Sequence, residues 1–211
     1  MDRRQLLRAS LVTAAAWPLV RTLRPGLALA QGVDVNAILH DPDAPEAGNP
    51  KGDVTIVAFF DYNCPFCKKA EPELEAAVTK DGRIRLVYKD WPILSDASIY
   101  AAQMALAAKY QGRYQDVHGA LMAIPGRKIA KDQMRQAIAG TGIDMAKLEA
   151  DRDSHKQEIG SLLQRTMAQA DAMGLQGTPV YLVGPLKVAQ ALDAKGFREA
   201  IAQARARQAG Q

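Results

Sequence analysis

Two cysteines between an apolar run and a helical pattern constrain the fold of this chain more than any other feature. Val54–Phe60 is a continuous run of apolar and β-branched residues, which is typical of a strand buried on both faces. A short Asp-Tyr-Asn turn follows, and Cys64-Pro65-Phe66-Cys67 then opens a segment to Lys80 that has the pattern of a helix. These are the only 2 cysteines among 211 residues. We therefore expect a sheet whose central strand delivers both thiols to the first turn of a helix.

The segment after the cysteines predicts a kinked helix and a second strand. Pro72 lies inside the helical pattern, where its missing N–H is expected to kink the helix. Arg83–Lys89 alternates, with Ile84, Leu86 and Tyr88 on one face, which is typical of a strand. Two strands joined by a helix in this way are expected to lie side by side and parallel.

A helical block is predicted to interrupt the sheet. From Ser95 to Gly174 the apolar residues recur at the helical period of about 3.6 residues. Ser154-His155-Lys156-Gln157 predicts a capped helix start within the block. The stripes of apolar residues that define the block begin at Ile99, Tyr114, Met134 and Ile159.

The two ends of the chain have simpler patterns. Gln31–Gly52 is rich in turn formers and is expected to be a loop-like extension, in which a short edge strand without a visible period remains open. Thr178–Val183 and Leu186–Val188 predict an antiparallel hairpin. Asp193 is a candidate cap for a last helix, whose end, Arg205–Gln211, is expected to fray.

The first thirty residues have the three parts of an export signal. Arg3-Arg4 provides a basic start, Ala9–Val20 a short apolar run and Ala28-Leu29-Ala30 a small-residue cleavage site. The apolar run is shorter than the roughly 20 residues that span a bilayer. The paired arginines favour the twin-arginine route, with a general secretory signal or an uncleaved anchor as alternatives. We expect cleavage after Ala30, where no cysteine is available to carry a lipid.

Removal of this segment changes the charge of the protein. The segment holds five of the 27 basic residues and one of the 23 acidic residues, so 22 of each remain. The basic excess therefore belongs to the signal, and binding to nucleic acid or to an anionic membrane is not expected. The remaining length suits one domain, or one domain with an insertion.

The cysteine pair is suited to reversible dithiol–disulfide chemistry. The first turn of a helix has unpaired N–H groups and the positive end of the helix dipole, which lower the pKa of a thiol at Cys64 below about 8.5. Pro65 fits this turn because its missing N–H has no partner there. Cys67 lies one turn further on and should be more buried. We therefore expect Cys64 to be the nucleophile and Cys67 the resolving cysteine.

Three other interpretations of the pair remain. A zinc site would need further ligands, but His40, His118 and His155 are far apart in the sequence and are more typical of structural or solvated positions. A purely structural disulfide across so short a loop would constrain little chain. A pair that has lost its redox activity is the third. We expect no metal and no cofactor other than the redox-active Cys64–Cys67 disulfide itself.

Thr178-Pro179 is the second feature that points to chemistry. A proline at the start of a strand leaves part of the strand edge unpaired, where the backbone of a substrate could bind beside the thiols. From the residues alone, both the trans and the cis form of this bond remain open.

Together these motifs resemble the exported DsbA-like branch of the thioredoxin superfamily, from Gly48 to about Arg207. The similar segments are the active-site segment Phe59–Lys69, the helix proline Pro72, the strand end Tyr88–Pro92 and the cis-proline loop Gly177–Pro179. The resemblance implies a thioredoxin fold, in which a central mixed sheet is flanked by helices, with an inserted all-helical domain. It also implies a cis Pro179, and a site supported by Pro65, Phe66, Thr178 and Pro179.

The implied domain organisation follows the motifs along the chain. It consists of a signal peptide (1–30), an N-terminal extension (31–52), a thioredoxin-fold domain (53–94 and 175–211) and an inserted helical domain (95–174).

The resemblance further implies a monomeric periplasmic oxidase. Such a protein donates its disulfide to unfolded or reduced exported proteins and is reoxidised by a membrane partner linked to quinones. Two departures from the family pattern matter. Phe66 replaces a histidine, which predicts a less oxidising pair than in the best-known members. Ala58 stands where a buried acid is common, so any proton transfer that this acid assists would pass to water or to another group. A disulfide isomerase or reductase of the same fold is one alternative function, and a redox-independent peptide-binding chaperone is another.

Overall fold

The predicted central strand, β2 (Val54–Phe60), lies in the middle of a five-stranded sheet in the computed structural model, which describes residues 33–210. The strand order is β1-β3-β2-β4-β5. β3 (Ile84–Asp90) runs parallel to β2, whereas β4 (Val180–Val183) pairs with β2 in the antiparallel direction and forms a hairpin with β5 (Leu186–Val188). The predicted mixed α/β fold is confirmed. The predicted signal peptide lies outside the described residues.

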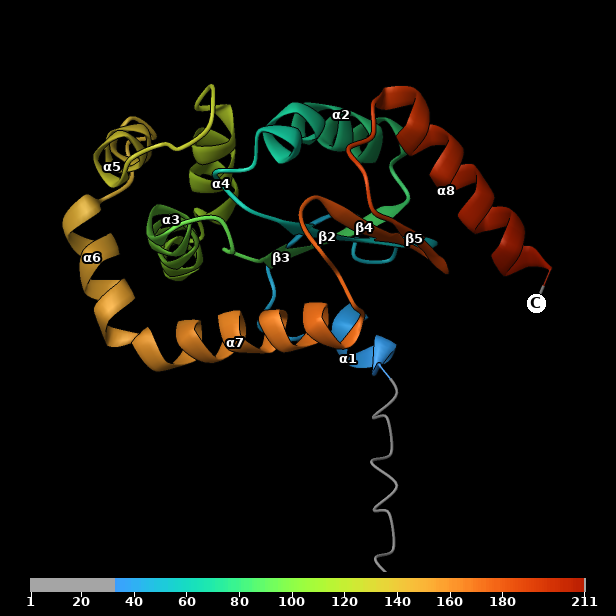
Figure 1. Ribbon diagram of the computed structural model, residues 1–211, viewed down its shortest axis with the longest axis horizontal. Helices are drawn as coiled ribbons and strands as arrows, with labels where there is room; N and C mark the ends of the chain where they lie inside the picture. Colours follow the sequence, from blue (N-terminus) through green and yellow to red (C-terminus); the bar gives the residue numbers. More distant parts are fainter. Residues whose placement is uncertain (1–32, 211) are drawn as a thin grey trace, which may run out of the picture. The chain divides into compact units, whose positions relative to one another are not determined.

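Helices cover both faces of the sheet (Figure 1). α2 (Pro65–Asp81) and α8 (Ala194–Ala209) pack on one face, and α7 (Lys156–Ala172) and α1 (Val35–Leu39) pack on the other. Successive side chains of a strand point to opposite faces, so β2 supplies Ile56 and Phe60 to the core under α2, and Val57 and Phe59 to the core under α7. This double burial explains why the strand is apolar throughout.

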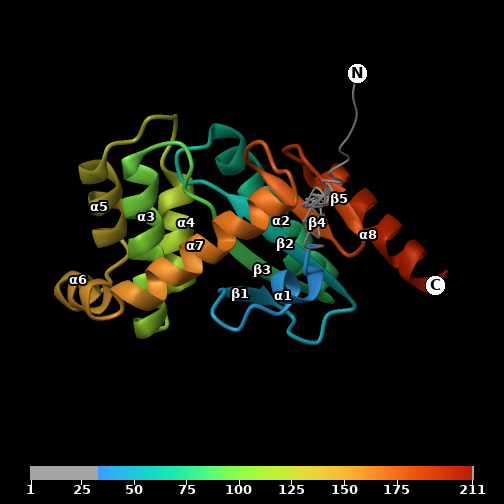
Figure 2. The ribbon, with the colours of Figure 1, turned by 60° about the horizontal axis from the view of Figure 1, so that its bottom comes forward.

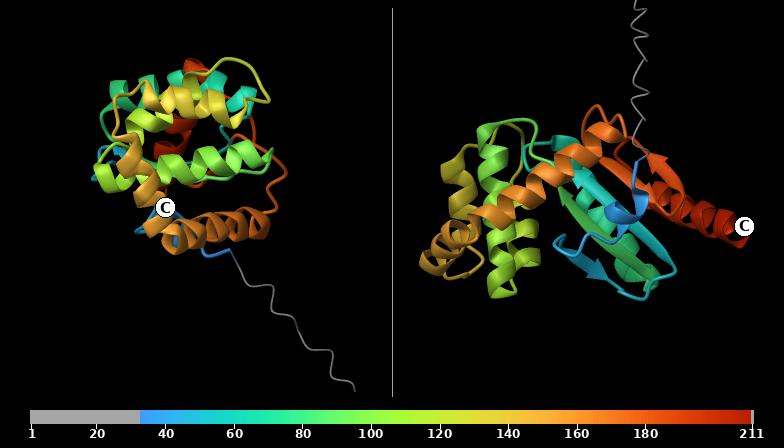
Figure 3. Two further views of the ribbon diagram at one scale, coloured as in Figure 1. Left: turned by 90° about the vertical axis from the view of Figure 1, so that its left-hand side faces the viewer. Right: turned by 90° about the horizontal axis from the view of Figure 1, so that it is seen from below.

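Between β3 and β4 the chain forms the helical block (Figure 3). α7 then runs from the block back across the sheet (Figure 2). The buried apolar side chains of the block are continuous with those under α2, and the described residues form one compact unit. The elements before α7 are α3 (Asp96–Ala107), the 3-10 helix η1 (Ala108–Gln111), α4 (Tyr114–Ala123), α5 (Lys131–Ala139) and α6 (Met145–Ser154).

The segment predicted as a loop-like extension contains a short helix that the prediction missed and a short edge strand that the pattern left open. α1 begins after its capping residue Asp34 and buries Ile38 against the sheet. β1 (Glu46–Gly48) adds an antiparallel edge strand to β3. Both elements are short and lie among prolines, so neither is long enough to display a period. Gly48 has a φ of 72° and lies against the Ile84 carbonyl, where a side chain would collide.

Three local predictions were also wrong. Ile99 is 41% exposed, so it does not belong to the buried stripe of α3. Ser154 ends α6 and therefore caps no helix start. Arg205 is held inside α8 by ion pairs with Asp53 and Asp81, and the helix continues to Ala209 without fraying at Arg205. The outcome at Arg205 depends on contacts with segments that are distant in the sequence.

No helix among residues 33–210 combines the length and the apolar character needed to cross a bilayer.

A buried ion triad joins the N-terminal segment, β3 and α7. The Lys89 ammonium lies 2.7 Å from the Asp41 carboxylate, and both side chains are almost fully buried. Arg165 of α7 donates two further hydrogen bonds to the same carboxylate. Burial raises the pKa of Asp41, but hydrogen bonds from Arg165 and Lys89 outweigh it and lower the pKa to about 2. The stabilisation of the folded state by the ionised Asp41 carboxylate is therefore fully present above about pH 3.8, and it is lost as the pH falls through about 2.

Replacing Asp41 with Asn is expected to lower the free energy of unfolding by about 3–5 kcal/mol, because the buried Lys89 ammonium loses its counter-charge. Urea denaturation at neutral pH measures the change. Asp153→Asn is the matched control, since that carboxylate pairs with Arg152 but its side chain is 71% exposed. The control is expected to change stability by about 0–1 kcal/mol. Equal losses in the two variants would contradict a special role for the buried triad.

Candidate active site

Cys64 occupies the N-cap position of α2, at the point where the chain leaves the central strand. Its backbone is extended, with φ −80° and ψ 113°, and its sulfur accepts a hydrogen bond from the Cys67 N–H at 3.3 Å. Pro65 is the first helical residue, where no N–H is needed. Both cysteines are free thiols in this structure. The first turn of the helix therefore points its unpaired donors at one sulfur.

The loop before β4 forms the opposite side of the site. The Thr178–Pro179 peptide bond is cis. The Cys64 thiol donates to the Thr178 carbonyl over 3.3 Å, which connects residues 114 positions apart in the sequence. The structure thus brings together Cys64, Pro65, Phe66, Cys67, Thr178 and Pro179, all of the residues that the sequence singled out.

The two thiols have opposite electrostatic surroundings. The pKa of Cys64 is lowered to about 6. The largest cause is hydrogen bonding from the Cys67 thiol. The Thr178 side chain and the backbone N–H groups of Cys67 and Phe66 add to it, and together they outweigh burial. Burial, and then the neighbouring Cys64 sulfur, raises the pKa of Cys67 far above its usual value. At neutral pH Cys64 is mainly a thiolate and Cys67 remains a thiol. This arrangement provides one nucleophile and one protonated partner.

Phe66 projects from the site and is 61% exposed. On one side it borders a hollow of about 480 Å³ that Thr178 and Pro179 also line. On the other side it borders a hollow of about 510 Å³ between the starts of α2 and α8. An exposed aromatic ring between two hollows offers apolar contact to an extended peptide near Cys64.

Asp61 fixes the turn that leads into the cysteines, a role that the sequence did not reveal. One carboxylate oxygen accepts from the Asn63 N–H and the Ser98 hydroxyl, and the other accepts from the N–H groups of Ile93 and Leu94. The side chain is buried with four donors around it. An aspartate in a turn before a helix is a common signal for such a bond, but its partners after β3 are visible only in the fold.

Asn63 and Lys68 tie the same region to the helical block. The Asn63 amide oxygen accepts from the Ile129 N–H at 2.6 Å, and its nitrogen donates to the Ser95 hydroxyl at 2.9 Å. The Lys68 ammonium donates to the Ile124 carbonyl at 2.8 Å. Burial lowers the pKa of Lys68, and the charges of Asp61 and Cys64 partly offset this effect. The Lys68 ammonium is thus a cation close to the Cys64 thiolate. The helical block therefore helps to position the active-site turn.

His118 of α4 lies beneath this turn and is fully buried, which agrees with the structural one of the two positions, structural or solvated, that the sequence left open. Its Nδ1 lies 3.0 Å from the Tyr62 hydroxyl, and its Nε2 lies 3.0 Å from a Glu71 carboxylate oxygen. Ala58, by contrast, fills its place under the sheet face with only a methyl group. The buried polar group of Tyr62, Glu71 and His118 could not be predicted from the sequence, because its members come from three separate elements.

No group of three or more histidine, cysteine or acidic side chains in the described part of the chain could hold a metal ion.

A sequence model of the thioredoxin family matches residues 41–203. The chain belongs to the thioredoxin superfamily, in its DsbA-like branch. A thioredoxin-like oxidoreductase from Silicibacter pomeroyi DSS-3 has the same fold, with a TM-score of 0.76 and 37% identity over 81% of this chain and 97% of that structure. The thiol:disulfide interchange protein DsbA of Bordetella parapertussis is 28% identical over 81% of both chains.

Similarity also extends to part of a membrane transporter. The Na(+)/H(+) antiporter NhaA 1 of Salinispora arenicola is 28% identical over 81% of this chain. The matching region covers only 26% of the antiporter sequence. This chain spans about a quarter to a third of the length of the antiporters that it matches.

The reactivity of this DsbA-like site should follow the charge of Cys64. Alkylation by iodoacetamide is expected to rise with pH and to be half-maximal near pH 6, because the thiolate is the reactive form. Cys67→Ser keeps this nucleophile and tests it alone, whereas Cys64→Ser should react slowly up to at least pH 8. A midpoint near the free-thiol value of about 8.5 in Cys67→Ser would indicate that the Cys67 thiol supplies most of the stabilisation of the Cys64 thiolate. The same midpoint in the wild type would contradict the lowered pKa of Cys64.

Proposed function

We propose that this DsbA-like protein forms disulfide bonds in exported proteins of the bacterial periplasm, with Cys64 as the nucleophile and Cys67 as the resolving residue. The observation that carries the proposal is the opposite character of the two thiols at the start of α2. Stabilising the Cys64 thiolate stabilises the reduced protein, so the oxidised form tends to give its disulfide away. The signal-like N-terminal residues support export.

The reaction requires only thiolate exchange. A substrate thiolate attacks Cys64 of the disulfide, and Cys67 leaves with the electron pair and takes up a proton. A second thiolate of the substrate then attacks the first substrate sulfur, which is bonded to Cys64, and Cys64 leaves as a thiolate. The substrate gains a disulfide and the protein becomes the free dithiol. Pro65, Phe66, Thr178 and Pro179 support this exchange around the two sulfurs. A quinone-linked membrane partner would restore the disulfide.

The pKa of Cys64 is also compatible with a second candidate function. A Cys64 pKa of about 6 lies between those of strongly oxidising and of reducing relatives, which are about 3.5 and about 7. A disulfide isomerase or reductase of the same fold is therefore the alternative. Reduction potential separates the two, since about −120 mV is typical of a strong oxidant and about −270 mV of a reductant.

The purified protein without residues 1–30 is expected to speed the oxidative refolding of a reduced disulfide-containing protein, at catalytic concentrations in a glutathione buffer. Cys64→Ser should abolish the acceleration, because no mixed disulfide can form. Recovery of activity from a scrambled substrate is measured in parallel. Efficient unscrambling with no acceleration of oxidation would favour the isomerase, and full activity in Cys64→Ser would overturn the proposal.

Phe66→His is expected to make the pair more oxidising, because an imidazolium beside Cys64 stabilises the thiolate. A decrease of about one unit in the pKa of Cys64 corresponds to an increase of about 30 mV in reduction potential. Equilibration with glutathione measures the potential, and Phe66→Leu is the control with an uncharged side chain. An equal rise in both variants would show that loss of the aromatic ring, and not the added charge, sets the potential.

A further inference from the structure

The loop between α4 and α5, residues 124–130, runs beside the active-site turn and is held to it at both ends. At its start, the Ile124 carbonyl accepts a hydrogen bond from the Lys68 ammonium at 2.8 Å. Near its end, the backbone of Ile129 exchanges two hydrogen bonds with the Asn63 amide, at 2.6 Å and 3.3 Å. Asn63 directly precedes Cys64, so the loop borders the reactive sulfur on the side of the helical block.

The middle of this loop exposes its basic side chains. Gly126 and Lys128 both have a positive φ, of 88° and 59°. A lysine in this region of backbone space is uncommon, because its Cβ lies close to the following carbonyl oxygen. Since both ends of the loop are fixed, the chain reverses between them, and Arg127 and Lys128 stay exposed while Ile129 is buried.

Four cations border Cys64 on this side, and we call them the basic rim. They are Lys68, which is half-buried, and Arg127, Lys128 and Lys131, which are exposed. None of the four forms an ion pair with a carboxylate among residues 33–210. Asp132 is the acidic residue in the first turn of α5. The positive charge of the rim is therefore largely uncompensated.

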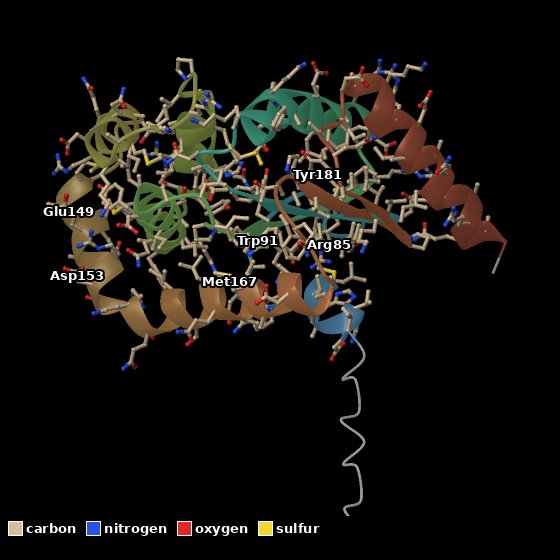
Figure 4. The ribbon with its side chains drawn as sticks, in the orientation of Figure 1. Arg85, Trp91, Glu149, Asp153, Met167 and Tyr181 are labelled. Atoms are coloured by element: carbon tan, nitrogen blue, oxygen red, sulfur yellow. The ribbon has the colours of Figure 1, made fainter. Side chains whose placement is uncertain are left out.

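Cations further into the helical block are paired instead. Arg135, one turn after Lys131 on α5, pairs with Glu149 of α6 at 2.9 Å. Arg152 of α6 pairs with Asp153 at 2.8 Å. Figure 4 shows Glu149 and Asp153 on α6, at the edge of the molecule away from the start of α2. The carboxylates of α6 thus neutralise their own neighbours and leave the basic rim free.

The opposite side of the site carries a different balance of charge. Acidic side chains outnumber cations around the hollow between the starts of α2 and α8, which is lined by Glu73, Asp193 and Glu199 together with Lys69 and Lys195. The Cys64 thiolate therefore lies between a basic border and a more acidic one. A chain that passes over Cys64 meets positive potential mainly on the side of the helical block.

We propose that the basic rim selects exported substrate proteins that carry acidic side chains close to the reacting cysteine. This inference rests on the proposed thiol exchange at Cys64. While the substrate sulfur lies at Cys64, a carboxylate a few residues away reaches the rim, because the loop is bonded to the residue before Cys64. The attraction speeds the encounter and fixes which end of the substrate segment lies against the helical block.

An anionic membrane fits this surface less well than a peptide does. The four cations form a narrow border beside a thiol, and an acidic hollow lies across from them. Basic and acidic residues also balance in the chain after Ala30, so the protein as a whole has no net attraction to a negative surface.

A single exchange step measures the selection directly. Three peptides carry one cysteine, activated as a pyridyl disulfide and flanked by aspartates, serines or lysines. The Cys64 thiolate of the reduced Cys67→Ser variant attacks the peptide sulfur, a disulfide to the peptide forms, and pyridinethiolate leaves with the electron pair. The absorbance of the leaving group gives the second-order rate constant. The rate of each peptide with mercaptoethanol corrects for its intrinsic reactivity.

At an ionic strength of about 0.01 M, the aspartate peptide is expected to react about tenfold faster than the lysine peptide. At about 1 M, where the Debye length is only about 3 Å, the difference should vanish. The combined variant Arg127→Gln, Lys128→Gln and Lys131→Gln should lose most of the difference and keep the rate of the serine peptide. Uncharged iodoacetamide should alkylate Cys64 in this variant at an unchanged rate, which shows that the site is intact.

The matched control combines Lys80→Gln, Arg198→Gln and Arg207→Gln, which remove the same charge from exposed positions at the end of α2 and along α8. It is expected to keep the preference for the aspartate peptide. Equal rates of the aspartate and lysine peptides before these changes, or equal loss of the preference in both combined variants, would overturn the inference. Equal peptide rates together with rim-dependent sedimentation on phosphatidylglycerol vesicles would assign the rim to a membrane surface. An unreactive serine peptide would instead refute the proposed exchange at Cys64.

Discussion

The contact between the first turn of α2 and the sulfur of Cys64 is the interaction on which the rest of the site depends. A helix start needs an acceptor for its unpaired N–H groups, and here the acceptor is the reactive atom itself. A thiolate satisfies those donors better than a disulfide sulfur, so the same bond that begins the helix favours the reduced protein. Capping and redox chemistry are therefore one physical effect at this position.

This contact is useful only because the turn before it is held rigidly. Asp61 binds the loop after β3, Asn63 binds the start of α3 and the loop before α5, and Tyr62 binds His118 of α4. These bonds are buried, so leaving any of them unpaired would carry a desolvation cost. The helical block thus forms part of the support of the active site, and its packing fixes the geometry of the cysteines.

Much of the fold could be predicted because the relevant signals are local. The apolar run of β2, the alternation of β3 and the helical period from Ser95 to Gly174 each appear within a short window. α1 and β1 could not be predicted, because five and three residues are too few to display a period and their stability comes from contacts with the sheet. Arg205 was misjudged for the same reason, since its carboxylate partners lie more than a hundred residues away.

The sequence by itself determined where the candidate reacting atoms lie: two cysteines at a helix start, preceded by a buried strand, are positioned by neighbouring residues and by the backbone donors of one turn. Only the tertiary structure decided what surrounds them. It placed the Thr178 carbonyl against Cys64 and buried His118 under the turn, within hydrogen-bond distance of Glu71. The physical reason is that burial and hydrogen-bond partners are properties of packed neighbours, and these come from segments that meet only when the chain has folded.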